Sequence, residues 1–397
     1  MSEQELTVTI GGIDFKNPIV VASATPTKNA RYMKKAIDAG AGGVVSKSVT
    51  TNPLLQRYVR PRFTILQRNG WPHSFSNYSC EFLATEKPEQ WADEMKQTKR
   101  YCEEADVVLI GSVGGGSLED WVSLSMMLQE AGADILELNF GCPHPRGHKL
   151  GFEVGRDPAL CSEIVRAVRK EAGVPIFVKV TPEAVDVLET VKAVREAGAS
   201  GVTAINRFPA LDIDIETGRP LLHGTFAGVG GPWMLPITLK WIAKIASAFP
   251  QMQISATNGI WTWKDVAKCI MVGATTVQVC TAILYGVKGY AVVGDMLTGL
   301  KSFLASKGCD SITDLKGITL KQIKSFEELD RDTKAWSVVD EGKCTGCMLC
   351  LNWCYYEAIS PLQGKVRIDA AKCDGCGLCV ALCPPRAVRM EGAKVYL

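Results

Sequence analysis

The sequence predicts an α/β protein made of a (β/α)8 barrel followed by a small α+β domain. Two observations carry this prediction. From about residue 18 to residue 284, short β-branched runs alternate with amphipathic helical stretches, which indicates repeated βα units around a parallel sheet. A spacing of four cysteines, C-x2-C-x2-C-x3-C, then occurs twice within the last 54 residues.

Eight runs have the composition of buried parallel strands, and this number matches a barrel better than an open Rossmann sheet. We expect the strands at 19–22, 43–47, 107–111, 135–139, 176–180, 202–206, 253–256 and 276–279. Ahead of them, LTVTIGGIDF alternates around Gly11 and Gly12, which predicts a hairpin that plugs one end of the barrel. Helix starts are predicted at Asp157-Pro158 and Thr181-Pro182 and, from capping-box spacing, after Thr262.

The chain divides into three predicted segments. The barrel occupies residues 1–306, a connector follows at 307–336, and the cysteine-rich domain occupies 337–397. Residues 286–336 have helical character and end in the charged run FEELDRDTK. Short apolar strands are expected at 366–368 and 387–390, one in each half of an internal repeat.

The doubled cysteine run is the ligand pattern of bacterial ferredoxins, in which the fourth cysteine of each run completes the other run's [4Fe–4S] cluster. The predicted ligands are Cys344, Cys347, Cys350 and Cys383 for one cluster, and Cys373, Cys376, Cys379 and Cys354 for the other. Two zinc sites or disulfides are the alternatives, but neither predicts a doubled run of four. We therefore expect a 2[4Fe–4S] ferredoxin-like domain that transfers single electrons.

Composition sets the class of protein. With 47% hydrophobic and 22% charged residues, the chain is expected to be globular with a large core. Its net charge of +2 gives no reason to expect nucleic acid or a membrane as a partner. No apolar run approaches the roughly 20 residues that span a bilayer, and MSEQELTVTI lacks the basic start of a signal peptide. Seven further cysteines are scattered like reduced thiols, which predicts a cytoplasmic protein.

Catalytic groups of such barrels lie at the C-terminal ends of the strands. The candidate site residues, which follow the predicted strands, are Lys47, Asn77, Asn139, Cys142, Lys179, Asn206, Arg207, Asn258, Gly259, Cys280 and Thr281. Asn258-Gly259 and the segment 273–281 belong to the last two βα units, where barrels commonly bind phosphate. Tight turns and packing glycines are the alternative there. A flavin monophosphate (FMN) would suit this position, because it converts two-electron chemistry into the single-electron steps that clusters accept.

The loop from Asn139 to Pro158 is longer than an ordinary βα connection, which favours an active-site loop or lid. Cys142 stands near its start, where a mostly protonated thiol would serve as a general acid. A buried, inert cysteine is the alternative. His144 and His148 are candidate ligands or acid/base groups, and a solvated role is the alternative for His148.

These residues resemble the flavin domain of the dihydroorotate dehydrogenase family. The matching motifs include VASATPT, SKS, ELNFGCPH, FVKVTP, AIN, GGP, NGI and QVCTA. Including the cluster domain, nearly the whole chain resembles catalytic subunits of dihydropyrimidine dehydrogenases of the PreA type. The resemblance implies hydride transfer between FMN and one carbon of an activated C=C bond.

Residue by residue, the resemblance implies that Lys47, Asn77, Asn139, Lys179 and Asn206 contact the flavin or the substrate. Lys179 would stabilise the reduced flavin, and Cys142 would exchange a proton with the neighbouring carbon. The residues expected around FMN are Ala22, Ser23, Gly230, Gly231, Gly259, Cys280 and Thr281. His144 is expected beside the substrate.

Three departures concern the substrate. Gly141 replaces the serine of pyrimidine-reducing relatives, Ser79 replaces a glutamate, and Arg207 replaces a threonine or serine. The expected substrate is a dihydropyrimidine/pyrimidine pair, as the resemblance implies. Because the pocket loses a carboxylate and gains a guanidinium, a ring that bears an anionic carboxylate or acyl group is the alternative. A surface position for Arg207, or pairing with Asp212 or Asp214, is the alternative. Tyr355, in place of the usual proline after the first cysteine run, is not expected to affect ligation.

No G-x-G-x-x-G motif follows a strand, so the expected electron source is a separate FAD/NAD(P)-binding subunit in an oligomeric assembly, with ferredoxin as the alternative. Two other functions are alternatives. The motif NxGCP also occurs in tRNA dihydrouridine synthases, but the near-neutral charge and the ferredoxin tail argue against RNA. A pure electron carrier with an inactive barrel is the other alternative, and replacing Cys142 distinguishes it.

Overall fold

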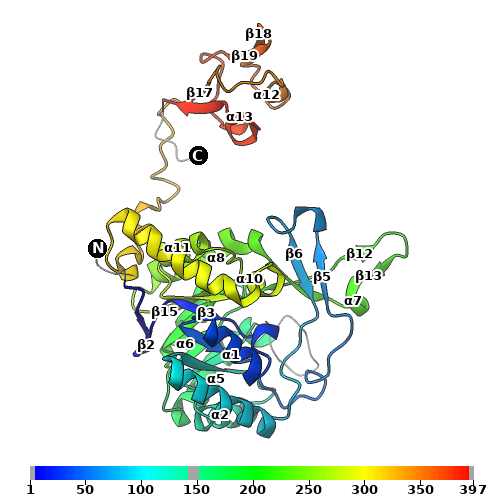
Figure 1. The fold of residues 1–397 in the computed structure, drawn as a ribbon, viewed down its shortest axis with the longest axis vertical. Helices are drawn as coiled ribbons and strands as arrows, with labels where there is room; N and C mark the ends of the chain where they lie inside the picture. Colours follow the sequence, from blue (N-terminus) through cyan, green and yellow to red (C-terminus); the bar gives the residue numbers. More distant parts are fainter. Residues whose placement is uncertain (1–4, 142–151, 393–397) are drawn as a thin grey trace. The chain divides into compact units, whose positions relative to one another are not determined.

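The computed structural model describes residues 5–141 and 152–392. The chain divides into two compact units at the junction between Ile323 and Lys324 (Figure 1). Among the described residues, no helix is both long and apolar enough to cross a membrane.

Eight parallel strands close into a barrel, which confirms the predicted fold class. They are β3 (Ile19–Val21), β4 (Gly43–Val45), β7 (Val108–Val113), β8 (Ile135–Asn139), β9 (Ile176–Lys179), β10 (Gly201–Ala204), β15 (Gln253–Thr257) and β16 (Thr276–Val279). The β8–β9 register pairs Asn139 with Lys179, so the polar ends of neighbouring strands lie side by side. Each strand lies within two residues of its predicted bounds, because buried β-branched runs mark strands clearly.

Helices surround the strands (Figure 1). The principal ones are α1 (Ala30–Asp38), α2 (Pro88–Ala105), α3 (Leu118–Glu130), α5 (Pro158–Glu171), α6 (Val187–Glu196), α8 (Leu235–Ala248), α9 (Trp263–Met271) and α11 (Val292–Lys307). The predicted cap of α5 is present: the Asp157 carboxylate accepts hydrogen bonds from the N–H groups of Ala159 and Leu160 at 3.1 Å each.

The start predicted at Thr181-Pro182 is wrong. There the Thr181 hydroxyl accepts the Glu183 N–H within a turn, and α6 begins at Val187 behind an Asp186 cap. The helical character predicted to residue 336 ends earlier, at the 3-10 turn Leu320–Gln322. Helix α11 packs on the barrel through Val293, Met296, Leu300 and Leu304. The charged run after it has no apolar face to bury.

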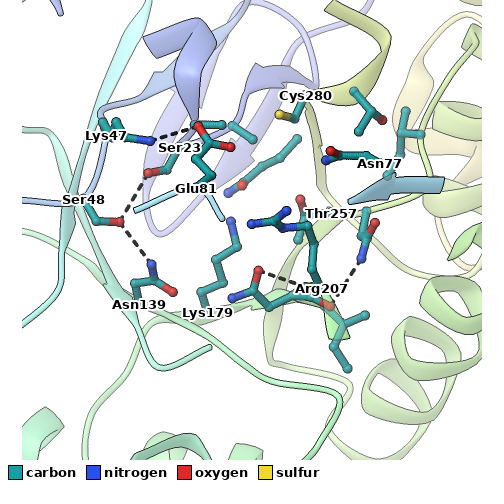
Figure 2. Close-up of a pocket in the computed structure, with 18 of the residues that line it drawn as sticks. Ser23, Lys47, Ser48, Asn77, Glu81, Asn139, Lys179, Arg207, Thr257 and Cys280 are labelled. Atoms are coloured by element: carbon teal, nitrogen blue, oxygen red, sulfur yellow. Dashed lines mark hydrogen bonds and ion pairs between the residues drawn. The ribbon is translucent and has the colours of Figure 1, made fainter. Parts of the chain in front are cut away.

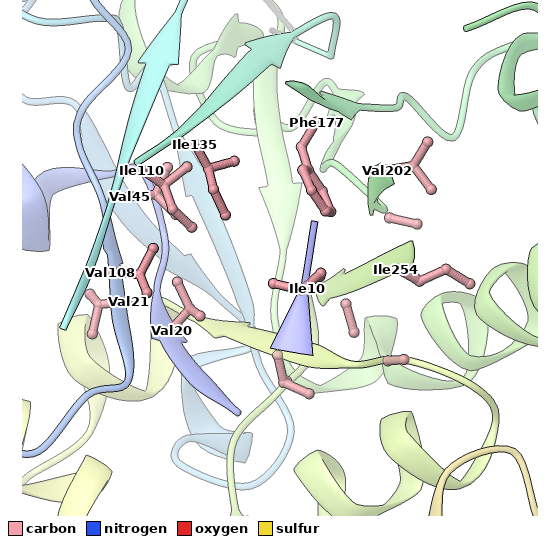
Figure 3. Close-up of a cluster of buried hydrophobic side chains, with 14 of the residues drawn as sticks. Ile10, Val20, Val21, Val45, Val108, Ile110, Ile135, Phe177, Val202 and Ile254 are labelled. Atoms are coloured by element: carbon pink, nitrogen blue, oxygen red, sulfur yellow. The ribbon is translucent and has the colours of Figure 1, made fainter. Parts of the chain in front are cut away.

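One end of the barrel is closed by the predicted hairpin of β1 (Val8–Ile10) and β2 (Ile13–Phe15). Gly11 and Gly12 both have positive φ, as a two-residue hairpin turn requires. Figure 3 shows Ile10 among barrel side chains such as Val20 and Phe177, and only 2% of Ile10 is exposed. The apolar plug leaves the opposite, C-terminal end for the site.

A second sheet, which sequence analysis did not predict, stands at that end. Its antiparallel strands follow the order β11 (Phe208–Ala210), β14 (Ala227–Gly230), β6 (Ser76–Ser79) and β5 (Phe63–Leu66). These strands come from the long loops after β4 and β10. They have three or four residues each, and their polar and glycine content hides the β pattern.

The C-terminal unit is built from two sheets of two strands. β17 (Trp336–Val339) pairs with β20 (Val388–Glu391), and β18 (Ile359–Leu362) pairs with β19 (Lys365–Ile368). Short helices α12 (Leu349–Asn352) and α13 (Leu378–Leu382) lie within the two cysteine runs. The two predicted strands match β19 and β20 to within one residue.

Candidate active site

A cavity of about 840 Å³, counting its open mouth, lies at the C-terminal end of the barrel. The predicted residues that line it are Ala22, Ser23, Lys47, Asn77, Asn139, Lys179, Asn206, Arg207, Asn258, Gly259, Cys280 and Thr281. The structure therefore brings together most of the side chains that follow the strands.

Three predicted residues lie behind the lining. A Cβ at Gly230, the last residue of β14, would lie 3.0 Å from Asn258 Oδ1, and one at Gly231, just after β14, would lie 2.5 Å from the Phe75 carbonyl oxygen. Both glycines allow the second sheet to pack closely against the cavity. Ser79 lies on β6 and is fully buried. Cys142, His144 and His148 lie outside the described residues.

The second sheet forms one wall of the cavity. Its register pairs Gly230 with Asn77 and Gly228 with Ser79. Asn77 is held in place by the Tyr285 hydroxyl, which donates to Asn77 Oδ1 at 2.7 Å. Two segments that are far apart in sequence thus present adjacent polar groups to one cavity.

Arg207 points into this cavity (Figure 2). Its Nη1 donates to Ser79 Oγ at 2.6 Å and to the Gly228 carbonyl oxygen at 3.2 Å. A Cβ at Gly228 would lie 2.7 Å from Arg207 Cζ, so glycine is needed for the guanidinium to lie there. Two of the three departures seen in the sequence, Ser79 and Arg207, are therefore in direct contact.

The alternatives considered for Arg207 are wrong. Asp212 accepts the N–H of Ile213, and Asp214 accepts those of Glu216 and Thr217, so both carboxylates stabilise their own turn. Within residues 5–141 and 152–392, no carboxylate forms an ion pair with Arg207. Its charge faces the cavity.

The third departure is explained by packing. A Cβ on Gly141 would collide with the side chain of Asn206, whose Nδ2 donates to the Gly141 carbonyl oxygen. Asn206 Oδ1 in turn accepts the Arg207 N–H at 3.0 Å. Gly141 thus allows Asn206 to hold the backbone just before Arg207.

Glu81 is a site residue that sequence analysis missed. Its Oε1 lies 2.9 Å from Lys47 Nζ and accepts the Thr25 hydroxyl at 2.6 Å. Burial by itself would raise the pKa of Glu81, but Lys47, Arg207 and Thr25 outweigh it and lower that pKa to about 2. Lys47 is 34 residues away in sequence, and Glu81 lies in an irregular loop, so no periodic pattern pointed to it.

The Lys47–Glu81 pair predicts a pH-dependent stability. The folded-state pKa of Glu81 is lowered from 4.5 to about 2, so its ionised form stabilises the fold above about pH 4.5. That contribution, on the order of 3 kcal/mol, is lost as the pH falls through the folded value. Glu81→Gln should therefore cost about 3 kcal/mol at pH 7 and progressively less below pH 4.5.

Urea unfolding followed by tryptophan fluorescence, from pH 7 to pH 3, measures this difference. Glu103→Gln is the matched control, because 63% of the Glu103 side chain is exposed. A difference between Glu81→Gln and the unchanged protein that does not vary with pH would contradict the assignment.

Lys179 lies at the floor of the cavity above a buried carboxylate. Glu137 Oε1 is 3.7 Å from Lys179 Nζ, and only 1% of the Glu137 side chain is exposed. Glu137 Oε2 accepts hydrogen bonds from Thr203 Oγ1 at 2.8 Å and from Gln278 Nε2 at 2.6 Å. Gln278 also lines the cavity, and its Oε1 finds no hydrogen-bond partner among the described residues. Gln278 was missed, although it begins the motif QVCTA.

Hydroxyl and amide groups form another edge of the cavity. Ser48 Oγ lies 3.3 Å from Ser23 Oγ and accepts the Asn139 amide at 3.1 Å (Figure 2). Burial raises the pKa of the Cys280 thiol to about 12, so this neighbour is neutral. At Gly259, φ is +84° and a Cβ would collide with Leu235 at the start of α8.

These observations fit FMN. The amide oxygen of Gln278 lies at the floor of the cavity and is an acceptor without a hydrogen-bond partner among the described residues. Several hydrogen-bond donors face the same space. The close approach of Gly259 to the N-terminus of α8, a helix of 14 residues, is the kind of place where phosphate binds. Three cations line the cavity; Lys47 and Lys179 lie near Glu81 and Glu137, and the Arg207 charge remains to offset that of an anionic ligand.

In the C-terminal unit, two smaller cavities are each lined by four of the eight cysteines. One of about 330 Å³, counting its open mouth, is lined by Cys344, Cys347, Cys350 and Cys383. The other, of about 320 Å³ on the same measure, is lined by Cys354, Cys373, Cys376 and Cys379. In the described part of the chain, no three ligating side chains converge tightly enough to hold a single metal ion. Each set of four thiols instead surrounds a space, which suits a cubane cluster.

Comparison with known proteins gives the family. Residues 5–304 match the model of the dihydroorotate dehydrogenase family, and residues 337–384 match that of the 4Fe-4S dicluster domain. The chain is 34% identical over 365 residues to the NAD-dependent dihydropyrimidine dehydrogenase subunit PreA of Escherichia coli, covering 89% of this chain and 86% of that protein. It is 33% identical over 316 residues to the catalytic subunit of dihydroorotate dehydrogenase B (NAD(+)) of Pyrococcus abyssi, covering 80% of this chain and 99% of that protein.

The family binds FMN, and the dicluster domain supplies the iron–sulfur centres. The relatives are oxidoreductases that act on CH–CH groups and are named as subunits. A closed barrel, a cavity with the donors that FMN needs and a C-terminal dicluster domain agree with both comparisons. The chain therefore belongs to the dihydroorotate dehydrogenase family, as a flavin- and iron–sulfur-dependent oxidoreductase of CH–CH groups.

Proposed function

We propose that this enzyme interconverts the C–C and C=C forms of a ring that carries a carboxylate or a comparable anionic group. The single observation that supports the anionic substrate is Arg207. Its guanidinium faces the cavity, and its hydrogen bonds to Ser79 and Gly228 both use one terminal nitrogen. Among the described residues, no other partner takes the remaining donors of this planar group, so they can form a bidentate bond to an anion.

The charges around the cavity also favour an anion. Lys47, Lys179 and Arg207 line it, whereas Glu81 is the acidic residue of the lining and is occupied by Lys47. Glu137 lies below the floor and faces Lys179. A neutral ring would leave the half-buried Arg207 charge facing the cavity without an anionic partner, which is less favourable.

The chain's own residues supply positioning and charge. Bound FMN supplies hydride transfer and exchanges single electrons with the clusters. We assign Lys179, with Glu137 beneath it, to hold positive charge against the reduced flavin, and Asn77, Asn139 and Asn206 to orient the ring. Cys142 gives or removes the proton on the carbon next to the hydride-accepting carbon.

The remaining predicted residues surround the cofactor in this proposal. Ala22, Ser23, Lys47, Gly230, Gly231, Asn258, Gly259, Cys280 and Thr281 would contact FMN, with the phosphate near Gly259 and α8. His144 and Ser79 would lie on the substrate side. The eight cysteines would hold two [4Fe–4S] clusters in the two sets that line the small cavities.

Electrons would come from an FAD- and NAD(P)-binding partner subunit, with ferredoxin as the alternative donor. The support is that both relatives are named as subunits and their names include NAD. We place the complex in the cytoplasm, because the cysteines outside the two sets, as far as the structure describes them, are unpaired thiols.

A matched pair of substrates tests the proposal. Orotate and uracil, with their dihydro forms, share one ring and differ in a carboxylate. Steady-state assays with the reconstituted complex should show kcat/KM at least about 10²-fold higher for the carboxylated pair. Equal turnover of both pairs, or preference for uracil, would overturn the anionic substrate.

A neutral dihydropyrimidine is the second candidate. It is favoured by the 34% identity to the dihydropyrimidine dehydrogenase subunit PreA. The same assay decides between the two, because preference for uracil and dihydrouracil is the result that this candidate predicts.

A further inference from the structure

The C-terminal unit is an internal repeat with an offset of 29 residues. The offset relates Cys344 to Cys373 and Cys350 to Cys379. It also relates β17 to β19 and β18 to β20. The two cluster cavities therefore have equivalent walls, and any difference between them stands out.

One buried position breaks this symmetry. Ser337 lines the cavity of Cys354, Cys373, Cys376 and Cys379, whereas its equivalent, Val366, lines the other cavity. Ser337 is 2% exposed and Val366 is 6% exposed. One cluster cavity thus has a buried hydroxyl where the other has two methyl groups.

The hydroxyl lies against cluster ligands. Ser337 Oγ is 3.3 Å from Cys379 Sγ and 3.4 Å from Met390 Sδ, and the Ser337 N–H donates to Cys373 Sγ at 3.4 Å. In the structure the Cys379 thiol donates to the hydroxyl. As a cluster ligand, Cys379 is a thiolate without that proton, so the hydroxyl becomes the donor. A charged sulfur is a better acceptor than the Met390 thioether.

Hydrogen bonds to cluster sulfurs raise a cluster's reduction potential, because they stabilise the more negative, reduced state. The two cavities also differ at other positions: Asp374 replaces Thr345, Tyr356 replaces Pro385, and apolar residues differ, such as Ile359 in place of Val388. The negative charge of Asp374 would lower the reduction potential of the nearby cluster. It is solvent-exposed, however, and solvent screens it, whereas Ser337 acts from within the protein.

We propose that Ser337 raises the reduction potential of the cluster held by Cys354, Cys373, Cys376 and Cys379. Val366, at the equivalent position of the other cluster, has no hydroxyl and therefore cannot raise that cluster's potential. An electron taken from the donor, which is oxidised by one electron, then occupies the Ser337-side cluster in preference. No bond forms or breaks in this step. The inference rests on the proposed ligand sets of the two clusters.

Redox titration of the holoenzyme followed by electron paramagnetic resonance tests it. Ser337→Ala should lower one of the two cluster midpoints, with about a tenfold fall in the reduced-to-oxidised ratio at fixed potential, or about 59 mV for one electron. Val366→Ser should raise the other midpoint. Ser337→Thr retains a hydroxyl and should keep the original value.

Iron and sulfide analysis tests the ligand assignment separately from the role of Ser337. If the unchanged enzyme lacks eight irons and eight sulfides, the ligand assignment itself fails. With both clusters present, midpoints that do not move, or that move together, overturn the role of Ser337. Should Ser337→Ala lose a cluster, Val366→Ser decides: a raised midpoint supports the proposal and an unchanged one overturns it.

Discussion

Replacing Arg207 with alanine is expected to lower kcat/KM for the carboxylated ring by about 10²- to 10³-fold. The same substitution should not lower kcat/KM for the uncarboxylated ring. The physical reason is the loss of a charge-assisted, bidentate hydrogen bond in a buried site, worth about 3–4 kcal/mol. Steady-state kinetics with orotate and uracil, and their dihydro forms, measure both values.

Three further variants sharpen this test. Arg207→Lys keeps the charge but loses the planar fork, so its activity should be intermediate. Gly228→Ala should lower the same value by a smaller factor, because the new Cβ would stand 2.7 Å from Arg207 Cζ and would displace the guanidinium without removing its charge. Arg219→Ala, on the exposed strand β13 (Arg219–Pro220), is the matched control and should change nothing. An equal loss for both substrates from Arg207→Ala would argue against carboxylate recognition.

Replacing Cys142 with alanine is expected to lower kcat by 10²-fold or more, because a positioned general acid or base contributes about that much. The reason is that hydride addition to one carbon stalls without a proton for its neighbour. The electron-transfer path does not pass through Cys142, so reduction of FMN by the partner subunit should keep its rate.

Rapid-mixing experiments separate these two half-reactions. Reoxidation of the reduced enzyme by substrate should slow, while reduction by the partner should not. Cys309→Ala, at a half-buried cysteine after α11, is the matched control. Unchanged turnover in Cys142→Ala would revive the electron-carrier alternative with an inactive barrel.

Much of the fold was predictable because it follows from local patterns. The barrel strands are runs of β-branched residues buried on both faces, and Asp157 capped its helix as expected. The cysteine sets were predictable because the doubled run is a recurring ligand pattern, in which three thiols from one run are joined by the fourth thiol of the other run. Thr181 failed as a helix start because its hydroxyl satisfied a turn instead.

The site was only partly predictable. Side chains that follow strand ends converge because parallel strands all end at the same rim, which made Lys47, Asn139 and Lys179 visible in the sequence. Glu81 and Gln278 were not predicted, since their roles depend on partners 34 and 141 residues away. The second sheet was missed for a similar reason, because long-range pairing forms its short strands.

By itself, the sequence determined the class of chemistry: periodicity specified the barrel, and cysteine spacing specified two clusters. Only the tertiary structure decided where Arg207 points. The sequence left it free to lie on the surface or to pair with Asp212 or Asp214. The pairing of β6 with β14 places Ser79 and the bare backbone of Gly228 beside the guanidinium. A contact across 128 residues depends on sheet register, and no local pattern encodes that register.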